Sequence, residues 1–170
     1  DLVKSQSGAI EKAAEAMISA LKAGGKIVIF GNGGSAADSQ HIAAELVGRF
    51  LKERKGLPAI ALTTNTSILT AIANDYSYNQ VFSRQVDAVA EKNDVAIGIS
   101  TSGKAANVIE AIEFENKKGL VTIALTGGDG GGLAKVAKIS IIVPSRSTPR
   151  IQESHVTIGH IICQLVEDAL

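Results

Sequence analysis

The sequence predicts an α/β fold, a three-layer α/β/α sandwich around a five-stranded parallel sheet. Apolar, strand-like runs alternate with stretches of helical periodicity along all 170 residues, and this alternation indicates parallel strands joined by right-handed crossover helices. Hydrophobic residues make up 45% of the chain but aromatic residues only 4%, so aliphatic side chains must fill the core, as in buried parallel sheets. No linker or repeat divides the chain, which predicts a single domain over residues 1–170.

Apolar spacing and glycine breaks define each element in turn. The first helix ends at Gly24-Gly25, because glycine adopts the left-handed conformation that terminates helices. The predicted helices are 8–22, 36–50, 67–73, 79–90, 105–118, a short one after residue 132, and 151–169. The predicted strands are 26–30, 58–63, 94–99, 120–125 and 139–143. Ligands of such sheets bind beyond the carboxyl ends of the strands, which are followed here by loops 31–35, 63–66, 100–104 and 126–132.

Charge and cysteine content exclude several classes of protein. Lys and Arg total 17, as do Asp and Glu, which argues against binding nucleic acid through bulk positive charge. No apolar run reaches the roughly 18–20 residues that span a bilayer, and we find no signal peptide. The single cysteine, Cys163, lies in an apolar helical stretch and is interpreted as a buried structural thiol in a reducing compartment. We therefore expect a cytoplasmic protein that binds neither nucleic acid nor membrane.

The loop Gly31–Ser35 reads Gly-Asn-Gly-Gly-Ser between a strand and a helix. Glycine lets backbone N–H groups approach a ligand closely, and a helix N-terminus favours polar or anionic oxygens. Gly31-x-Gly33-x-x-Ala36 also fits the dinucleotide fingerprint formally, but the second strand ends in Thr63-Thr64-Asn65, without the carboxylate that would bind a ribose. A dinucleotide site and a purely structural turn remain the alternatives to a small-ligand loop.

A second loop, Ser100-Thr101-Ser102-Gly103-Lys104, also joins a strand to a helix. Three hydroxyls, a glycine and a helix N-terminus suit a phosphate, although the spacing is not that of a Walker A loop. The alternative is an ordinary N-cap by Ser102. Two such loops at neighbouring strand ends indicate a small phosphorylated ligand.

The reactive residues are His41 and Glu45, which lie four apart on one helix face, and His160 in the last helix. His160 stands among isoleucines, where an unpaired polar group costs roughly 1–3 kcal/mol. With the Gln152 amide, these residues match a zinc site of the His/carboxylate kind. From spacing alone, a metal site, an acid/base pair and a solvated surface pair all stay open.

Taken together, these motifs resemble the sugar isomerase (SIS) family and, within it, the phosphoheptose isomerases. The resemblance runs from about residue 8 to the end of the chain. The motifs that carry it are Gly31-Asn32-Gly33-Gly34-Ser35, His41-x-x-x-Glu45, Ala73-Asn74-Asp75, Ser100-Thr101-Ser102-Gly103, Leu125-Thr126-Gly127, Arg150-Ile151-Gln152-Glu153-x-His155 and Gly159-His160-Ile161. Where the family usually has a serine after Ser-Thr-Ser-Gly-x, this chain has Ala105, so one hydroxyl contact to a phosphate is missing.

The resemblance implies a flavodoxin-like SIS fold and a homotetramer with active sites at subunit interfaces. It implies conversion of D-sedoheptulose 7-phosphate to D-glycero-D-manno-heptose 7-phosphate, for the lipopolysaccharide core. It also implies Glu45 and His160 as the acid/base pair, and one Zn²⁺ per subunit. The implied zinc ligands are His41, Glu45, Gln152 and His160. The implied substrate contacts are Asn32, Gly33, Gly34, Glu45, Asn74, Asp75, Ser100, Thr101, Ser102 and Gln152.

The ligand set raises a question of geometry, because Gln152 and His160 are eight residues apart, about 12 Å along a regular helix. Either the last helix begins after Gln152, or different subunits supply the two side chains.

Two other functions fit parts of the sequence. One is a non-catalytic SIS protein that binds the bacterial replication initiator and lacks the second histidine; the other is a sugar-phosphate-sensing regulator, which would need a DNA-binding segment. His160 favours the isomerase. In that reaction Glu45 would move the carbon proton and His160 the oxygen proton through an ene-diol.

Overall fold

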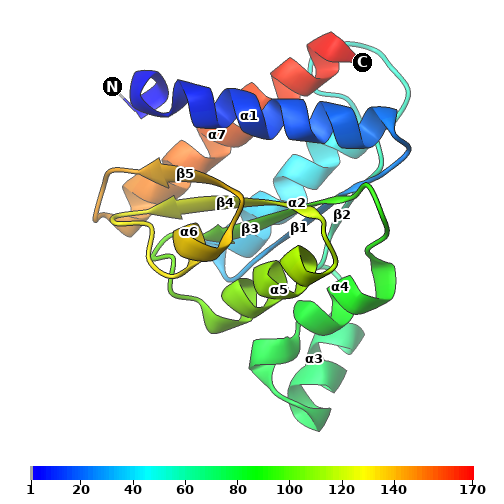
Figure 1. The fold of residues 1–170 in the computed structure, drawn as a ribbon, viewed down its shortest axis with the longest axis vertical. Coiled ribbons are helices and arrows are strands. Elements are labelled where there is room, and N and C mark those ends of the chain that lie inside the picture. Colours follow the sequence, from blue (N-terminus) through cyan, green and yellow to red (C-terminus); the bar gives the residue numbers. More distant parts are fainter. Residues whose placement is uncertain (1) are drawn as a thin grey trace.

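The computed structural model describes the backbone of residues 2–170 and side chains from Ser5 onward; of the predicted domain, only Asp1 lies outside the described residues. A five-stranded parallel sheet in the order β2-β1-β3-β4-β5 lies between two layers of helices (Figure 1). The strands are β1 (Ile27–Gly31), β2 (Ala59–Ala61), β3 (Val95–Ser100), β4 (Val121–Gly127) and β5 (Ile139–Val143). The predicted fold is confirmed, and the strand order is that of flavodoxin.

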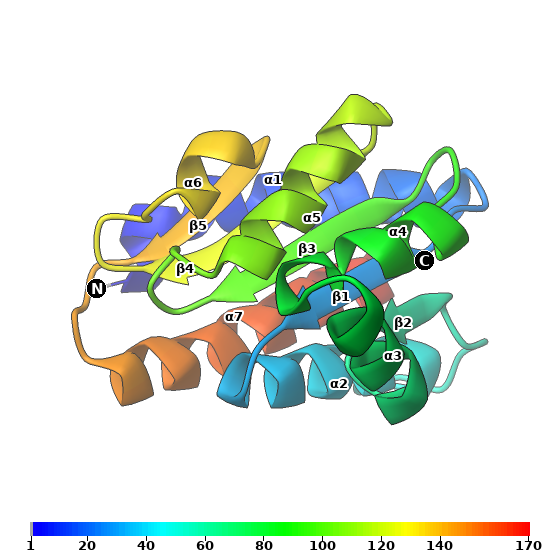
Figure 2. The ribbon, with the colours of Figure 1, turned by 90° about the horizontal axis from the view of Figure 1, so that it is seen from below.

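Each face of the sheet has its own helix layer, as Figure 2 shows. The first layer consists of α1 (Leu2–Lys22), α2 (Gly34–Val47) and α7 (Thr148–Ala169). The second consists of α3 (Thr66–Asp75), the short 3₁₀ helix η1 (Tyr78–Gln80), α4 (Ser83–Val89), α5 (Ala106–Lys117) and α6 (Leu133–Val136). Alternate residues of β1 supply both cores: Ile27 and Ile29 face the first layer, and Val28 and Phe30 the second, as the two-residue period of a strand requires.

Two of the differences between the observed and the predicted helices have clear physical reasons. The predicted helix 79–90 is interrupted between η1 and α4, where Val81 and Phe82 turn inward and become fully buried, Phe82 stacking on Phe30 at 5.3 Å. The last helix begins at Thr148, three residues earlier than predicted, with Pro149 in its first turn. Proline is tolerated there because the first N–H groups of a helix have no intrahelical acceptor.

The order of the strands brings two loops together. β1 pairs with β2 on one side and β3 on the other, so that Gly31 at the end of β1 lies opposite Ile99 near the end of β3. A side chain at Gly31 would come within 2.7 Å of the Ile99 carbonyl oxygen. The loops after β1 and β3 therefore meet at the carboxyl edge of the sheet, at the switch point where α/β proteins bind ligands.

None of the helices described in residues 2–170 combines the length and apolar character needed to cross a membrane. Cys163 is buried in α7. The pKa of its thiol is raised to about 12, mainly because the thiol is buried. It is an unreactive structural thiol, as the sequence predicts.

One carboxyl group of the second layer is buried without a hydrogen bond from the described residues. Glu115 of α5 is fully buried, and neither carboxyl oxygen has a hydrogen-bond partner among the described residues. Burial, followed by the charge of Asp94, raises the pKa of Glu115 to about 7, against the opposing charges of Lys118 and Lys26. The folded protein therefore holds this proton more tightly than the unfolded chain does.

This raised pKa predicts how stability depends on pH. The contribution of protonated Glu115 is complete below the unfolded value of 4.5 and is lost as the pH rises through about 7. Relative to Glu115→Gln, we expect the free energy of unfolding of the wild type to fall by about 2–3 kcal/mol between pH 5 and pH 8. Urea denaturation at several pH values measures this difference. Glu113→Gln, at an exposed position of the same helix, should show no such trend; parallel pH profiles for wild type and Glu115→Gln would contradict the prediction.

Candidate active site

The loop after β1 is held by a network of amides. Asn32 and Asn107 of α5 exchange two side-chain hydrogen bonds, of 2.8 and 2.9 Å, and the Tyr78 hydroxyl donates to the Asn32 oxygen at 3.2 Å. Gly33 follows with a positive φ of 55°, which a residue with a side chain rarely adopts. Both the nitrogen and the oxygen of the Asn32 carboxamide are already hydrogen-bonded. The loop therefore offers a ligand mainly its backbone groups.

Gln152 of α7 lies at the start of α2. Any Cβ atom on Gly34, the first residue of α2, would overlap the side-chain amide of Gln152. The structure therefore brings the Gln152 side chain next to Gly34, one of the predicted substrate residues.

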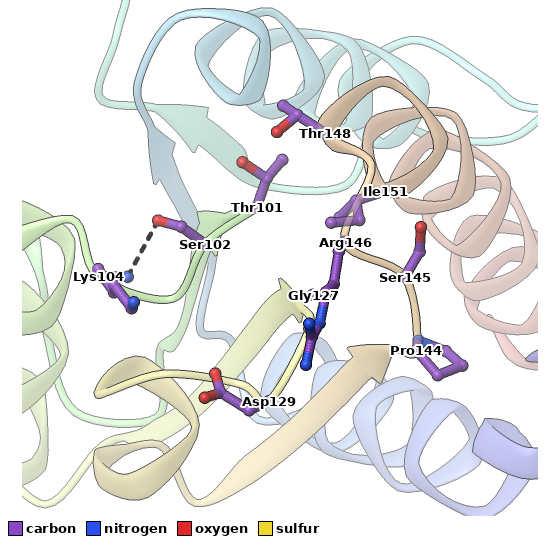
Figure 3. A pocket seen from close by; sticks show the side chains of 11 residues that line it. Thr101, Ser102, Lys104, Gly127, Asp129, Pro144, Ser145, Arg146, Thr148 and Ile151 are labelled. Atoms are coloured by element: carbon purple, nitrogen blue, oxygen red, sulfur yellow. Dashed lines mark hydrogen bonds between the residues drawn. The ribbon is translucent and has the colours of Figure 1, made fainter.

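The second predicted loop borders a cleft of about 580 Å³ beyond β3, β4 and β5. Figure 3 shows Thr101 and Ser102 on one side of it and Arg146 extending beside Gly127 on the other. Ser100 itself is buried at the end of β3. The lining residues are Thr101, Ser102, Lys104, Gly127, Gly128, Asp129, Pro144, Ser145, Arg146, Thr148 and Ile151. Hydroxyls, glycine backbone and two cations make this cleft suitable for an anionic group.

The alternative role of Ser102 as the helix N-cap is wrong. α5 is preceded by Ala105 in the cap position, with no side-chain hydrogen bond to the helix. The Ser102 hydroxyl instead accepts the Lys104 N–H at 3.3 Å. No side chain in the cap position accepts a hydrogen bond from the N-terminal N–H groups of α5. A phosphate-binding loop requires N–H groups that are free in this way.

His41, Glu45 and His160 form a cluster between α2 and α7. Their nearest nitrogen and oxygen atoms all lie within 4.8 Å of one another. The Nε2 atoms of His41 and His160 are 2.7 Å apart, and His41 Nε2 lies 3.4 Å from Glu45 Oε1. Ligand atoms around a tetrahedral zinc ion are about 3.3 Å apart. A small increase in the 2.7 Å distance between the two Nε2 atoms would therefore make room for a zinc ion. The donor set therefore fits a divalent metal.

A glycine contact brings the two histidines together. Gly159 and Ile42 are the neighbours of His160 and His41, and a Cβ atom on Gly159 would lie 2.9 Å from two carbons of the Ile42 side chain. Ile42 is itself buried in the core. The lack of a side chain at Gly159 is therefore what allows α7 to approach α2 closely at this point.

Some of the predicted site residues lie away from the cluster of His41, Glu45 and His160. Asn74 and Asp75 are exposed at the end of α3, where the Asn74 amide donates to Asp75 at 2.8 Å. Gln152 and His160 both lie within the single helix α7, so the idea that this helix begins after Gln152 is wrong. Within one chain the Gln152 side chain lies against Gly34 at the start of α2 and is not part of the cluster of His41, Glu45 and His160.

Sequence reasoning missed several residues around the site. Asn107, Tyr78 and Phe50 had no recognisable signal, although the Phe50 ring lies 5.4 Å from that of His160. Asp38, three residues before His41, is buried with one oxygen unpartnered among the described residues; burial raises its pKa and the charge of His41 lowers it. A carboxyl one turn from His41 was readable from helical spacing.

His155, in contrast, is a core residue. It is completely buried, 3.1 Å from the Thr126 carbonyl oxygen, and burial lowers its pKa despite that contact. His155 therefore belongs to the core and takes no part in the cluster of His41, Glu45 and His160.

Comparisons with known proteins agree on one family. The family model for the SIS domain matches residues 1–127. The chain is 59% identical over 164 residues to the phosphoheptose isomerase of Citrifermentans bemidjiense, a match that covers 96% of this chain and 85% of that protein. The structure of phosphoheptose isomerase GmhA from Neisseria gonorrhoeae aligns with a TM-score of 0.92 and 46% identity, over 97% of this chain and 88% of that one. The phosphoheptose isomerase from Francisella tularensis aligns with a TM-score of 0.91 and 40% identity, over 95% and 86%.

The contact at Gly159 predicts a local effect of added volume. In Gly159→Ala the new methyl group would push α7 away from Ile42, and we expect the free energy of unfolding to fall by about 1–3 kcal/mol, together with weaker binding of divalent metal. Urea denaturation and metal titration measure the two effects. Gly8→Ala is the control, because a Cβ atom there meets nothing within 4 Å. Unchanged metal affinity in Gly159→Ala would contradict this role of the glycine.

Proposed function

This chain belongs to the phosphoheptose isomerase family of SIS-domain proteins, and we propose that it converts D-sedoheptulose 7-phosphate to D-glycero-D-manno-heptose 7-phosphate. This aldose–ketose isomerisation is the first step of ADP-heptose synthesis for the lipopolysaccharide core. The convergence of His41, Glu45 and His160 is the observation that carries the proposal. It favours catalysis over the binding of a replication initiator, which needs no such donor set.

The reaction moves two protons between neighbouring atoms of the sugar. Glu45 removes a proton from C1 of the ketose and returns it to C2, while His160 protonates O2 as the ene-diol forms and later takes the proton from O1. Both residues lie in the same cluster. Glu45 and His160 each carry a second polar atom, so that one atom can face a metal while the other exchanges a proton.

We assign one Zn²⁺ per subunit to His41, Glu45 and His160, with Gln152 of a second copy as the fourth ligand. When bound, zinc polarises the carbonyl group of the sugar. His41 has no proton-transfer role in this scheme and serves as a ligand.

The substrate would extend from the metal cluster to the cleft. His41 lies seven residues beyond Gly34 in α2, about 10 Å along the helix. We place sugar hydroxyls at Asn32, Gly33, Gly34 and Gln152, and the phosphate at Ser100, Thr101 and Ser102. Lys104 and Arg146 line the same cleft, and their positive charges support a phosphate there.

The exposed apolar surface supports the homotetramer. α3 buries none of its residues. Large hydrophobic side chains around it and at the end of α2 are exposed, among them Val47, Leu51, Ile60, Ile68, Tyr76 and Tyr78. An interface here would bring Asn74 and Asp75 of one copy toward the site of another. The sugar-phosphate substrate and the single buried cysteine support a cytoplasmic location.

The proposed domain is the whole chain. The family match ends at residue 127, but β5 extends the same sheet and α7 packs in the same helix layer. We therefore assign residues 1–170 to one SIS domain.

Replacement of Glu45 by glutamine tests the assignment of the base. Glu45→Gln keeps the shape of the side chain but removes its ability to accept the carbon proton, and we expect kcat to fall by at least about 100-fold. An assay of sedoheptulose 7-phosphate isomerisation measures this. Glu53→Gln, at an exposed position in the loop after α2, should retain the wild-type rate. A near wild-type rate in Glu45→Gln would show that another group is the base.

Metal content tests the cluster independently of the substrate. We expect about one zinc ion per subunit by elemental analysis, loss of activity on removal of the metal with a chelator, and recovery when Zn²⁺ is added back. His41→Ala should lower the zinc content without unfolding the protein, since His41 is partly exposed. Full activity of the zinc-free protein would disprove the role of the metal and leave the isomerase assignment standing.

A further inference from the structure

A buried ion pair joins the segment that follows α2 to the end of α7. Arg54 Nε lies 3.0 Å from Glu167 Oε1, and the two side chains are only 12% and 2% exposed. Arg54 belongs to the irregular segment between α2 and β2, and Glu167 to the last turns of α7. This pair is not part of the cluster described above, but it lies on the same two elements.

Glu167 is fully occupied by donors. Its Oε1 accepts the N–H of Phe50 at 3.0 Å as well as Arg54, and its Oε2 accepts the N–H groups of Leu51 and Lys52 at 2.7 and 2.9 Å. Burial by itself would raise the pKa of Glu167, but these three N–H groups and the Arg54 guanidinium hold it at about 2. The carboxylate thus remains charged, and it fixes the backbone of the residue whose ring packs against His160.

Arg54 holds the end of α2 with its other nitrogens. Nη2 donates to the backbone carbonyl oxygen of Glu45 at 2.9 Å, and Nη1 to that of Leu46 at 2.8 Å. The last carbonyl groups of a helix have no intrahelical donors, and α2 has no basic residue in its last turn. The guanidinium therefore caps α2 at the residue that carries the proposed base.

The spacing along α7 joins both contacts to one helix face. His160 and Glu167 are seven residues apart in α7, which is two turns on nearly the same face. α7 thus meets α2 at His41 through His160, and meets the segment after α2 through Glu167. A rotation or shift of α2 against α7 would have to break the ion pair.

We propose that Arg54 and Glu167 are positioning residues of the isomerase centre: their ion pair fixes the end of α2 and Phe50 against α7, so that His41, Glu45 and His160 converge. This inference rests on the proposed metal-assisted isomerase function. Neither residue touches the reacting atoms. Loss of the pair should act as loss of outer-shell support does at metal sites, where affinity falls about 10–100-fold.

Glu167→Gln and Arg54→Lys are the variants that test this role. Arg54→Lys keeps the positive charge near Glu167 but lacks the fork that reaches the carbonyl oxygens of Glu45 and Leu46. In both variants we expect Zn²⁺ affinity, measured by competition with a chromogenic chelator on the metal-free protein, to fall at least about tenfold. We also expect kcat for sedoheptulose 7-phosphate to fall while KM changes less than about twofold, since the phosphate loop lies elsewhere.

Two controls separate positioning from stability. Asp168→Asn removes the neighbouring ion pair with Lys52, which is 2.5 Å long and exposed, and should change neither zinc affinity nor kcat. Val166→Ala, at a fully buried position of the same helix turn, should lower the melting temperature but leave zinc affinity and kcat at wild-type values.

The outcomes distinguish this proposal from the function on which it rests. Wild-type zinc affinity and kcat in folded Arg54→Lys and Glu167→Gln would overturn the positioning role, as would an equal loss of both in Val166→Ala. Should Glu167→Gln fail to fold, Arg54→Lys decides. If the wild-type protein binds Zn²⁺ but does not isomerise sedoheptulose 7-phosphate, the proposed function fails; weaker zinc binding in the two variants would then still support the role of the ion pair.

Discussion

The close approach of α7 to α2 at Gly159 is the constraint on which the rest of the site depends. With no side chain at Gly159, the buried Ile42 packs directly against the backbone of α7; His41 comes just before Ile42 in the sequence, and His160 comes just after Gly159. The 2.7 Å between the His41 and His160 nitrogens therefore follows from apolar packing in the core. The position of this partly exposed cluster is therefore set by a buried contact between α2 and α7.

The sheet places this helix pair at the edge where α/β proteins of this strand order bind ligands. β1 stands at the switch point of the strand order, and α2 begins directly after it. The loop before α2 thus lies at the carboxyl edge of the sheet, and the His41–Glu45 pair lies further along the same helix. Gln152 and His160 follow the same division on α7, one at the start of α2 and one at the cluster. The two neighbouring helices α2 and α7 thus carry both the proposed binding residues and the proposed catalytic residues.

Sequence patterns predicted what depends on short spacing. Each strand, each of the two predicted ligand loops and the His41–Glu45 pair is encoded by residues that lie close together in the sequence. The structure contains the predicted parallel sheet and brings His41 and Glu45 into one cluster with His160. The patterns could not predict contacts between distant segments: Asn107 bonded to Asn32, Phe50 against His160, or Arg54 capping α2. The break between η1 and α4 was missed because the burial of Phe82 against Phe30 outweighs local helix periodicity.

Apolar packing and the ion pair do different work at this helix crossing. The Gly159–Ile42 contact fixes how near the helices come, but a methyl group against a backbone resists rotation of either helix only weakly. Hydrogen bonds are directional, and Glu167 accepts four of them while Arg54 donates to the carbonyl oxygens of Glu45 and Leu46. A buried ion pair is often no more stable than an apolar replacement. Its advantage here is orientation, because the guanidinium that pairs with Glu167 of α7 also donates a hydrogen bond to the backbone carbonyl oxygen of Glu45, the proposed base.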